Sequence, residues 1–487
     1  MEKQPPLTNE TLQETLGAYE RENPARFHMP GHKGRGLSGF WREELQLWDV
    51  TELSNTDNLH APGGAIDAAQ REMAKAYGVE QSFFVVNGGT NAVQAMILAL
   101  SESDKLLLAR DCHKSAIGGA ALRGIETCYL SPEYDEAHGL LGMVTPETLD
   151  AALEETHATA VLITTPNAYG FCAEVAKLSE TAHRHGALLL IDGAHGAHYP
   201  FSDALPQGLG AFADLFVHSQ HKTMDALTQA ASLHRNDCRI TPEQLRRALA
   251  MTETTSPSYL LMASLDWSVY MARRRDWTGQ VARCLVLEKK IEAIPGYTVF
   301  HDPVGIGVSE RDRTRLVVDV TERGYTGYEA QAALEQRNIF IEMADARRLV
   351  LITTPNDEPA WYDQLLTSLA ELPKRKQQKL GSTGEKIRFS KNEQRLRIRE
   401  ATFAQTRTMQ LVMAAGKIAA EAVGIYPPGI ALVMPGEVIR QSTIDDLLMQ
   451  ERGGASLFGV YKGSIFVVDE QSRSNKKFNL NPEYWNL

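Results

Sequence analysis

The stretch that decides the fold is Phe212–Ala230, which is F-A-D-L-F-V-H-S-Q-H-K-T-M-D-A-L-T-Q-A. Its apolar run, Leu215–Val217, has the composition of a buried strand and ends in the polar cluster His218–Thr223. This cluster puts a lysine, hydroxyl groups and two imidazoles at the carboxyl end of the strand. Open α/β sheets bind their ligands at the carboxyl ends of their strands. The stretch therefore predicts an α/β protein with its chemistry around Lys222.

A second strand of the same kind lies upstream. The apolar run Ala187–Ile191 is followed directly by Asp192. A lysine on one strand end and an acid on another are the groups that pyridoxal 5′-phosphate requires. The lysine holds the cofactor covalently, and the acid keeps the pyridine nitrogen protonated so that the ring accepts electrons. We therefore predict this cofactor, with Lys222 and Asp192 as its partners. The structural alternatives are a surface lysine and an aspartate that caps a turn.

The predicted phosphate site is a glycine turn between a strand and a helix. Phe83–Val86 is strand-like, and N-G-G-T at Asn87–Thr90 leads into a segment with helical periodicity. Such a turn directs backbone N–H groups and the helix dipole at an anion. This turn has neither a Walker A nor a G-x-G-x-x-G pattern, so the anion need not be a nucleotide. The candidate phosphate ligands are Gly89, Thr90, Asn91, Ser219 and His221. The alternative is an ordinary strand–helix turn.

Residues from about 11 to about 290 alternate short apolar runs with amphipathic stretches. The strand-like runs are Ser82–Val86, Lys105–Leu108, Ala160–Thr164, Ala187–Ile191 and Leu215–Val217. Ala92–Ser101 and Pro146–Glu155 are helix-like. This alternation predicts a mainly parallel sheet with helices on both faces.

With 487 residues, the chain is expected to form two or three domains. We predict an N-terminal segment with a large cofactor-binding domain (1–290), a small α/β domain (291–373), a linker (374–385) and a C-terminal α+β domain (386–487). The small domain is assigned strands at Arg315–Val320, Ile339–Met343 and Leu349–Thr353, and helices at Thr326–Arg337 and Asp357–Leu372. In the C-terminal domain, Arg407–Ala422 is predicted to be helical.

Composition narrows the class of protein. A formal net charge of -11 disfavours nucleic acid as a partner. The five cysteines are scattered and include no C-x-x-C pair, which indicates reduced thiols and predicts neither a disulfide framework nor a metal site. The N-terminus lacks the apolar core of a signal peptide, and no apolar run approaches the roughly 20 residues that span a bilayer. We expect a cytoplasmic protein with a small-molecule substrate and no membrane partner.

Nine stretches resemble the Orn/Lys/Arg decarboxylases, fold-type-I pyridoxal-phosphate enzymes that act on basic amino acids. They are Arg26–Gly36, Asp57–Gly64, Val86–Asn91, Arg110–Ser115, Thr165–Gly170, Asp192–His198, Ser219–Gln229, Thr255–Asp266 and Tyr426–Glu437. These stretches span nearly the whole chain, whose length is similar to that of the short form of the family. The resemblance implies a homodimer or higher homo-oligomer with shared active sites.

The resemblance also implies roles for individual residues. Lys222, Asp192 and His113 match the lysine that binds the cofactor, the partner of its pyridine nitrogen and the histidine stacked on its ring, and are the predicted catalytic groups. Thr90, Ser219 and His221 fall where the family contacts the phosphate. His195 is expected to line the pocket. His28 and His32 are expected near the active site of the same or a neighbouring subunit. Taken alone, each histidine is as readily explained by a structural role.

The implied reaction is decarboxylation of a basic L-amino acid. Arginine, giving agmatine and CO₂ for polyamine synthesis, is the first expectation, and lysine or ornithine is the next. The distal cation needs a carboxylate, because an unpaired buried charge is costly. Glu342, Asp345 and Glu437 are the candidates, each with a structural salt bridge or cap as its alternative. The competing functions are an aminotransferase or lyase of the same fold, and a catalytically silent regulatory homologue.

Three positions depart from the family pattern. Met224-Asp225 replaces the usual Leu-Pro after the lysine, Ala168 replaces an aromatic residue, and Ala431 stands where proline is usual. The residues that carry the reaction are retained. The departures therefore bear on the identity of the substrate more than on the class of reaction.

Overall fold

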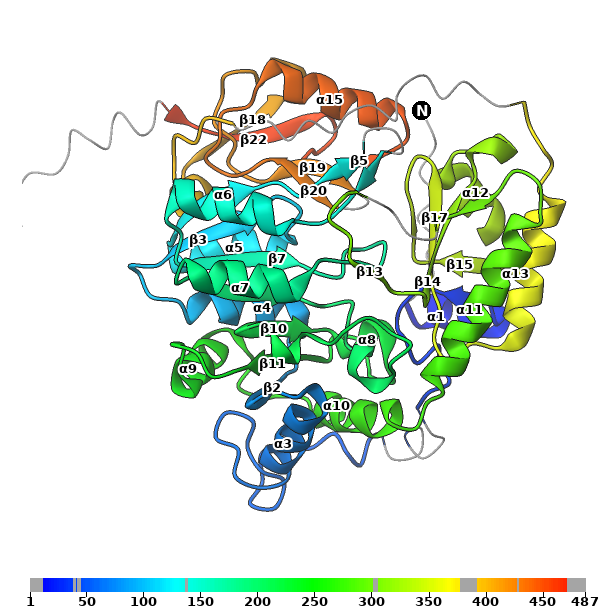
Figure 1. Cartoon of the computed structure of the whole chain (residues 1–487), viewed down its shortest axis with the longest axis horizontal. Helices are drawn as coiled ribbons and strands as arrows, with labels where there is room; N and C mark the ends of the chain where they lie inside the picture. Colours follow the sequence, from blue (N-terminus) through cyan, green and yellow to red (C-terminus); the bar gives the residue numbers. More distant parts are fainter. Residues whose placement is uncertain are drawn as a thin grey trace, which may run out of the picture.

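The structure is a computed structural model in which residues 12–37, 41, 45–135, 139–300, 305–376, 392–426 and 429–470 are described. Figure 1 shows a central sheet with its helices, a smaller sheet at one side and a C-terminal unit above the central sheet.

The central sheet has seven strands in the order β2-β11-β10-β9-β7-β3-β4. They are β2 (Gln81–Val85), β11 (Ala231–Arg235), β10 (Leu215–His218), β9 (Leu188–Asp192), β7 (Ala160–Thr164), β3 (Lys105–Ala109) and β4 (Glu126–Leu130). Only β11 runs antiparallel to its neighbours. The five predicted strands and the predicted α/β class are confirmed, whereas β4 and β11 were not predicted.

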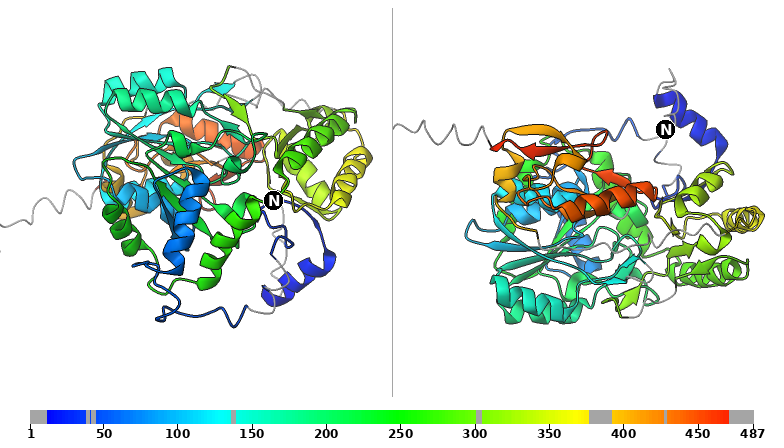
Figure 2. Two further views of the ribbon diagram at one scale, coloured as in Figure 1. Left: turned by 60° about the horizontal axis from the view of Figure 1, so that its bottom comes forward. Right: turned by 90° about the horizontal axis from the view of Figure 1, so that it is seen from above.

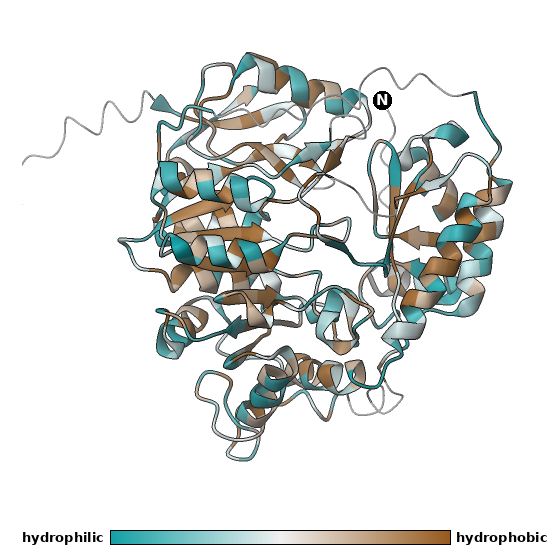
Figure 3. Ribbon diagram, in the orientation of Figure 1, coloured by the Kyte–Doolittle hydropathy of each residue, from teal (hydrophilic) through white to brown (hydrophobic). Residues whose placement is uncertain are grey.

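Helices cover both faces of this sheet because its strands are apolar on both sides, as the brown strands in Figure 3 show. Along β3, Leu106 and Leu108 enter one core while Leu107 enters the other. The first core is covered by α4 (Gly88–Leu98), α5 (Lys114–Arg123) and α9 (Pro242–Thr252), and the second by α6 (Pro146–Thr156) and α7 (Val175–Arg184). Thr145 accepts a hydrogen bond from Thr148 N and so caps α6. Beside β2 lie α3 (Ala65–Tyr77) and α10 (Tyr259–Ala272).

The smaller sheet is antiparallel, in the order β12-β14-β17-β16. Its strands are β12 (Thr298–Val299), β14 (Arg315–Asp319), β17 (Arg348–Ile352) and β16 (Met343–Ala344), with helices α11 (Trp277–Glu292), α12 (Gly327–Glu335) and α13 (Pro359–Glu371). The predicted strand Ile339–Met343 is split into β15 (Ile339–Ile341) and β16.

The N-terminal segment packs against this smaller unit. Strand β1 (Ala25–Phe27) pairs in parallel with β15, and Tyr19 of α1 (Leu12–Glu22) contacts Phe340 with ring centroids 5.7 Å apart. Both views of Figure 2 place α1 beside the smaller unit. The loop that follows β1 is thereby directed toward the central sheet.

The C-terminal unit contains a two-stranded and a three-stranded sheet. Its elements are α14 (Ile398–Thr402), β18 (Thr406–Gln410), β19 (Val423–Tyr426), β20 (Ile430–Val433), α15 (Gln441–Arg452), β21 (Ser456–Phe458) and β22 (Ser464–Val468). The predicted helix Arg407–Ala422 is wrong, because residues 406–410 pair with β22 from Thr406↔Val468 to Gln410↔Ser464. This distant pairing overrides the local pattern.

Short elements complete the described chain. They are β5 (Tyr134–Asp135), β6 (Leu140–Leu141), β8 (Phe171–Cys172), β13 (Glu310–Arg311), α8 (Gln220–Thr223) and 3₁₀ turns at Tyr199–Phe201, Leu209–Ala211, Thr321–Arg323 and Leu411–Met413. Most of the predicted linker, from residue 377 onward, lies outside the described residues. All five cysteines are free. Within the described ranges, no helix is long and apolar enough to cross a membrane and no residue cluster is arranged to bind a metal.

Candidate active site

Lys222 lies in the single helical turn α8, directly after β10. Its Nζ is 2.9 Å from Nε2 of His195. Burial lowers the pKa of Lys222, while the carboxylates of Asp192 and Glu342 act in the opposite direction. A lowered pKa favours the neutral amine, the form of lysine that attacks a carbonyl group.

Asp192 ends β9, the strand next to β10, at the position paired with Val217. Its side chain is buried, and Oδ1 accepts a hydrogen bond from Ala194 N at 3.2 Å. The negative charge of Asp192 acts to raise the pKa of both Lys222 and His113. The structure therefore brings the three predicted catalytic residues to one edge of the sheet.

His113 caps α5 at its N-terminus. Its Nδ1 accepts a hydrogen bond from Ser115 N at 3.2 Å and is 2.8 Å from Ser115 Oγ. Because a backbone N–H can only donate, the neutral ring carries its proton on Nε2. The side chain is exposed. This leaves the imidazole available for the predicted contact with a cofactor ring.

The glycine turn before α4 meets the residue that ends β10. A Cβ atom at Gly89 would lie 2.4 Å from Ser219 Oγ, so only glycine fits without displacing that hydroxyl. Gly88 has a φ of 82°, in the region that favours glycine. The exposed Thr90 lies in the first turn of α4. The helix N-terminus and Ser219 thus form a cradle that suits a phosphate group.

Two predicted phosphate ligands have other contacts. Asn91 Nδ2 donates to Thr252 Oγ1 at 2.6 Å and so holds the end of α9. His221 Nδ1 donates to Ala230 O at 3.0 Å, which leaves Nε2 as an acceptor in the neutral ring. Burial lowers the pKa of His221 to about 4. The neutral ring then has no N–H group left for a phosphate, and the predicted role of His221 as a phosphate ligand stays a prediction.

The loop after β1 packs directly on the Lys222 turn. Gly31 N donates to His221 O at 2.8 Å, and a Cβ at Gly31 would lie 2.3 Å from the carbonyl carbon of Thr223. His28 and His32 lie on this loop, and their place near the active site of the same or a neighbouring subunit stays a prediction. His28 is 3.0 Å from Tyr19 OH through Nε2, and burial lowers the pKa of His32 to about 4.

Lys33, on the same loop, is a second enclosed lysine. Its side chain is 1% exposed, and Nζ donates to His28 O at 2.6 Å and Ile352 O at 3.0 Å. Burial lowers the pKa of Lys33 to about 8. Lys33 therefore fastens the histidine-bearing loop to β17 of the smaller sheet.

Glu342 is the candidate acid that lies with Lys222. Its Oε2 accepts a hydrogen bond from Met29 N at 3.0 Å, and its charge acts to raise the pKa of both Lys222 and Lys33. Among the described residues, no hydrogen bond is formed by Oε1. This oxygen is available to a cationic ligand.

The other two candidate acids are already paired. Asp345 Oδ2 accepts hydrogen bonds from Tyr169 OH at 2.9 Å and Arg348 Nη1 at 3.1 Å. Glu437 is 1% exposed and forms a bidentate ion pair with Arg110, the residue that follows β3. Asn392 Nδ2 and Met434 N complete the partners of the Glu437 carboxylate, each at 2.9 Å. These contacts give Glu437 a structural role in joining the C-terminal unit to the central sheet.

Two residues at the site were not singled out from sequence. Arg315, the fully buried first residue of β14, is 2.8 Å from His195 Nδ1 through Nη2. Asp111 has a buried Oδ1 without a hydrogen-bond partner, and burial together with Asp192 raises the pKa of Asp111 to about 7. The available signals were an arginine that opens an apolar strand and an acid directly before Cys112-His113.

The departures from the family pattern have defined places. Asp225 accepts a hydrogen bond from Arg275 Nε at 2.9 Å and also contacts Asn356 Nδ2. These contacts link the Lys222 turn to the segment between α10 and α11 and to the loop after β17. Ala168 O accepts a hydrogen bond from Arg315 Nη1 at 3.1 Å, and Ala431 is buried in the core beneath the C-terminal unit.

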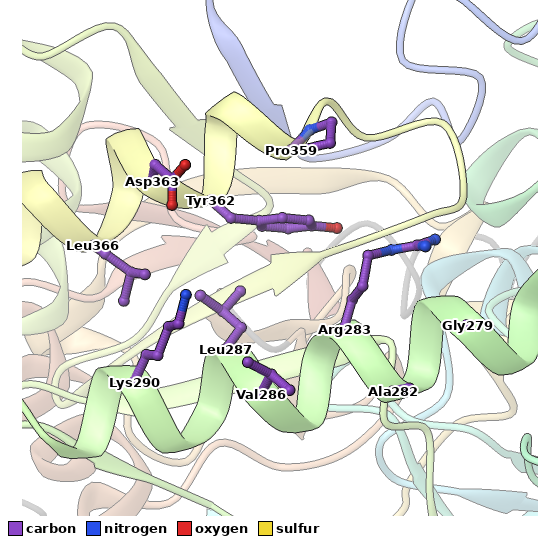
Figure 4. Close-up of a pocket in the computed structure, with 10 residues that line it drawn as sticks. All are labelled: Gly279, Ala282, Arg283, Val286, Leu287, Lys290, Pro359, Tyr362, Asp363 and Leu366. Atoms are coloured by element: carbon purple, nitrogen blue, oxygen red, sulfur yellow. The ribbon is translucent and has the colours of Figure 1, made fainter.

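A separate surface cavity of about 400 Å³ lies between α11 and α13 (Figure 4). It is lined by Gly279, Ala282, Arg283, Val286, Leu287, Lys290, Pro359, Tyr362, Asp363 and Leu366. None of the predicted site residues is among them. This cavity is therefore distinct from the site around Lys222.

Known proteins are similar to this chain in sequence or in fold. Residues 5–301 match the model of the Orn/Lys/Arg decarboxylase major domain, and residues 390–464 match that of the C-terminal domain. The chain is 31% identical over 458 residues to an arginine decarboxylase of Halalkalibacterium halodurans, covering 91% of this chain and 93% of that protein. The arginine decarboxylase of Bacillus subtilis is 31% identical over 474 residues, covering 93% and 96%. The lysine decarboxylase LdcF of Francisella novicida superposes with a TM-score of 0.73 at 17% identity, covering 90% of this chain and 78% of that chain.

Proposed function

Because the chain belongs to the Orn/Lys/Arg decarboxylase family, we propose that it removes the α-carboxyl group of L-arginine, giving agmatine and CO₂, with pyridoxal phosphate as cofactor. Family membership makes it an amino-acid decarboxylase, with the fold of the fold-type-I decarboxylases. The observation that supports a basic amino acid as substrate is the carboxylate of Glu342, whose charge acts on Lys222. Arginine is favoured over lysine and ornithine because relatives named arginine decarboxylase match more than nine-tenths of the chain.

The residues at the site fit the proposed cofactor. The cradle of Gly89 and Ser219 at the N-terminus of α4 would hold its phosphate, and Asp192 would hold its ring nitrogen. Lys222 would bind its aldehyde carbon, and His113 would lie on its ring. When bound, pyridoxal phosphate supplies an electron sink for the bonding pair that is released as CO₂ departs.

The chain's own side chains orient the substrate and manage protons. Glu342 Oε1 is available to a guanidinium group, for which a carboxylate is the preferred planar partner. Lys222, as a neutral amine, accepts a proton when it is displaced by the substrate amine. Once protonated, Lys222 can return this proton to the substrate α-carbon. The way in which these side chains hold the substrate would decide which of its bonds is broken, and the cofactor would supply the electron sink.

Two other functions compete with this proposal. An aminotransferase or lyase would use the same Lys222 and Asp192 but would give a keto acid or no CO₂. A silent homologue would have no need to retain both Lys222 and Asp192 at the ends of two neighbouring strands. The match to the family over both of its domains supports the decarboxylase against the aminotransferase or lyase.

The test is to measure CO₂ release by the cofactor-loaded protein with arginine, lysine and ornithine in parallel, and to identify the amine product. Release with arginine, together with agmatine, is expected to exceed release with the other two. Cadaverine or putrescine as the main product would replace arginine by lysine or ornithine. A keto acid without CO₂ would contradict the decarboxylase proposal.

We also propose that the protein is a cytoplasmic homodimer that supplies agmatine to polyamine synthesis. Exposed apolar side chains support a subunit interface. Leu45, Leu47 and Leu53 are 48%, 71% and 52% exposed on one loop. Sedimentation equilibrium is expected to give twice the mass of the chain. Charged substitutions at Leu47 and Leu53 are expected to shift the mass toward that of one chain.

A further inference from the structure

Three side chains from three separate elements form a line that ends at the reactive lysine. Arg315 Nη2 is 2.8 Å from His195 Nδ1, and His195 Nε2 is 2.9 Å from Lys222 Nζ. Arg315 opens β14 of the smaller sheet, His195 follows β9 and Lys222 lies in α8. Arg315 of the smaller sheet is thereby linked to the reactive amine through the imidazole of His195.

The direction of these hydrogen bonds follows from the chemistry of the three groups. A guanidinium group has only N–H donors and no acceptor, so His195 Nδ1 must accept the hydrogen bond from Arg315. A neutral imidazole with an unprotonated Nδ1 carries its proton on Nε2. His195 Nε2 is therefore the donor to Lys222, and Nζ must accept. An amine nitrogen accepts only when it is neutral.

Burial favours the neutral form of both His195 and Lys222, whereas the nearby charges act in both directions. Burial lowers the pKa of His195 well below its usual value, and the charge of Lys222, when it is protonated, and that of Arg315 lower it further. Lys222 is in turn faced by Asp192 and Glu342, which favour the ammonium form, and by Arg315, which disfavours it. His113 and His221 also face His195, and each lowers the pKa of His195 when protonated.

The position of Arg315 is itself fixed. Its side chain is fully buried, and Nη1 donates to Ala168 O at 3.1 Å, on the loop after β7. Among the described residues, no carboxylate forms a salt bridge with it. One edge of the guanidinium group is thus anchored to a backbone carbonyl, while another N–H group is directed at His195.

We propose that Arg315 is a positioning residue that holds His195 in the tautomer protonated on Nε2, and that His195 in turn holds Lys222 as the neutral amine. The proposal rests on the proposed function only in naming Lys222 as the reactive lysine. It assigns His195 the role of a hydrogen-bond donor. His195 is then not the base that takes up a proton from Lys222, nor the acid that protonates the substrate.

The first test measures the reactivity of Lys222 in the full-length protein freed of cofactor. The protein is labelled with acetic anhydride at pH 7.5, and the peptide containing Lys222 is quantified by mass spectrometry against the exposed Lys289. Arg315→Met is expected to slow the labelling of Lys222 by about tenfold, the effect of a rise of one pKa unit on the neutral fraction. Arg347→Met, which removes an arginine paired with Asp319, is the matched control and should leave labelling unchanged. Unchanged labelling in Arg315→Met would overturn the proposal.

The second test reads the tautomer directly, because loss of the Arg315 charge alone would also raise the pKa of Lys222. Nitrogen-15 NMR of histidine-labelled protein, with His195→Gln to assign the signal, is expected to show a neutral ring protonated on Nε2 from pH 6 to 9. A proton on Nδ1, or a doubly protonated ring, would refute the proposal even if Arg315→Met does not fold. If folded Arg315→Met shows the same His195 tautomer as the wild type, then Arg315 does not set that tautomer.

Neither measurement requires turnover. A protein that fails to decarboxylate any basic amino acid but gives the expected labelling and tautomer would contradict only the proposed function. An active decarboxylase with a doubly protonated His195 would contradict only the present inference. The two proposals can therefore fail separately.

Discussion

Lys222 and Lys33 differ in what their amines meet, although the protein encloses both side chains and burial lowers the pKa of each. The amine of Lys222 meets a ring nitrogen of His195, whereas the amine of Lys33 meets the carbonyl oxygens of His28 and Ile352. Carbonyl oxygens only accept hydrogen bonds, so Lys33 always donates. The two buried lysines thus differ in the hydrogen-bonding role of their partners, which allows Lys222 to accept and makes Lys33 a donor that holds its loop in place.

The largest expected effect distinguishes Lys222, the lysine proposed to bind the cofactor covalently, from Lys33. Lys222→Ala should lower the rate of CO₂ release by roughly 10,000-fold, because the group that binds the cofactor covalently is lost. Lys33→Met should keep covalent attachment of the cofactor at Lys222. Borohydride reduction followed by peptide mapping measures this attachment. Attachment that survives in Lys222→Ala but disappears in Lys33→Met would reverse the two roles.

The second prediction concerns the contact between the two lysine-bearing segments. Gly31→Ala should destabilise the protein by about 3 kcal/mol, because the new Cβ would lie 2.3 Å from the carbonyl carbon of Thr223 and backbone must move. Thermal and urea unfolding measure the loss. Gly63→Ala is the matched control, since nothing lies within 4 Å of a Cβ there. Equal stability of the two variants would show that the segments are not held together at Gly31.

The third prediction uses the proton that Lys33 loses on folding. Lys33 has a pKa of about 8 in the fold, against about 10.4 in an unfolded chain. Between these pH values the unfolded chain binds the extra proton, so the contribution of Lys33 to stability grows as pH rises. The unfolding free energy of the wild type minus that of Lys33→Met should increase by about 2 kcal/mol from pH 7.5 to pH 10.

Urea unfolding at each pH measures this difference. Lys289→Met, at an exposed position, should show no such trend. If the difference in unfolding free energy between the wild type and Lys33→Met stays constant or falls as pH rises, Lys33 keeps its proton in the fold. Burial would then not lower the pKa of Lys33.

The smallest expected effect concerns the acid that both lysines share. Glu342→Gln should raise the KM for arginine about tenfold, because the amide removes the charge that faces the guanidinium group. The preference for arginine over its uncharged analogue citrulline should shrink by a similar factor. Glu371→Gln, on the exposed end of α13, is the control. A larger fall in kcat than rise in KM would place Glu342 in the chemistry of Lys222 instead of in substrate binding.

Much of the central sheet could be predicted because its strands are short apolar runs that need no partner to be recognised. Leu215–Val217 and Ala160–Thr164 are examples, and both lie in the sheet as expected. Strand β11 was missed because its residues, A-S-L-H-R, mix polar and apolar types. It is a strand because it fills the gap between β2 and β10. The false helix at Arg407–Ala422 has the same origin, since its pairing partner lies more than fifty residues away in β22.

In the candidate site too, some residues could be located from sequence and others could not. Lys222, Asp192 and Gly89 could be located from sequence because each directly follows a recognisable strand or turn. Arg315 could not, because its importance depends on the smaller sheet lying beside the central one. The proposal of Glu342 among the three acids also needed the structure, since only contacts in space show that Arg110 pairs with Glu437 and that, within the described part of the chain, Glu342 Oε1 forms no hydrogen bond.

The pairing of β1 with β15 has a consequence for the order of assembly during synthesis. Met29 and Glu342, which are hydrogen-bonded beside the reactive lysine, are separated by 313 positions. During translation Lys222 is synthesised well before β15, so β1 has no pairing partner while the central sheet forms. Contacts of such long sequence separation are slow to form, because the entropy of closing a long loop must first be overcome. The histidine-bearing loop is therefore seated after the central sheet, and a growing chain acquires its catalytic pocket only after the smaller sheet has been synthesised.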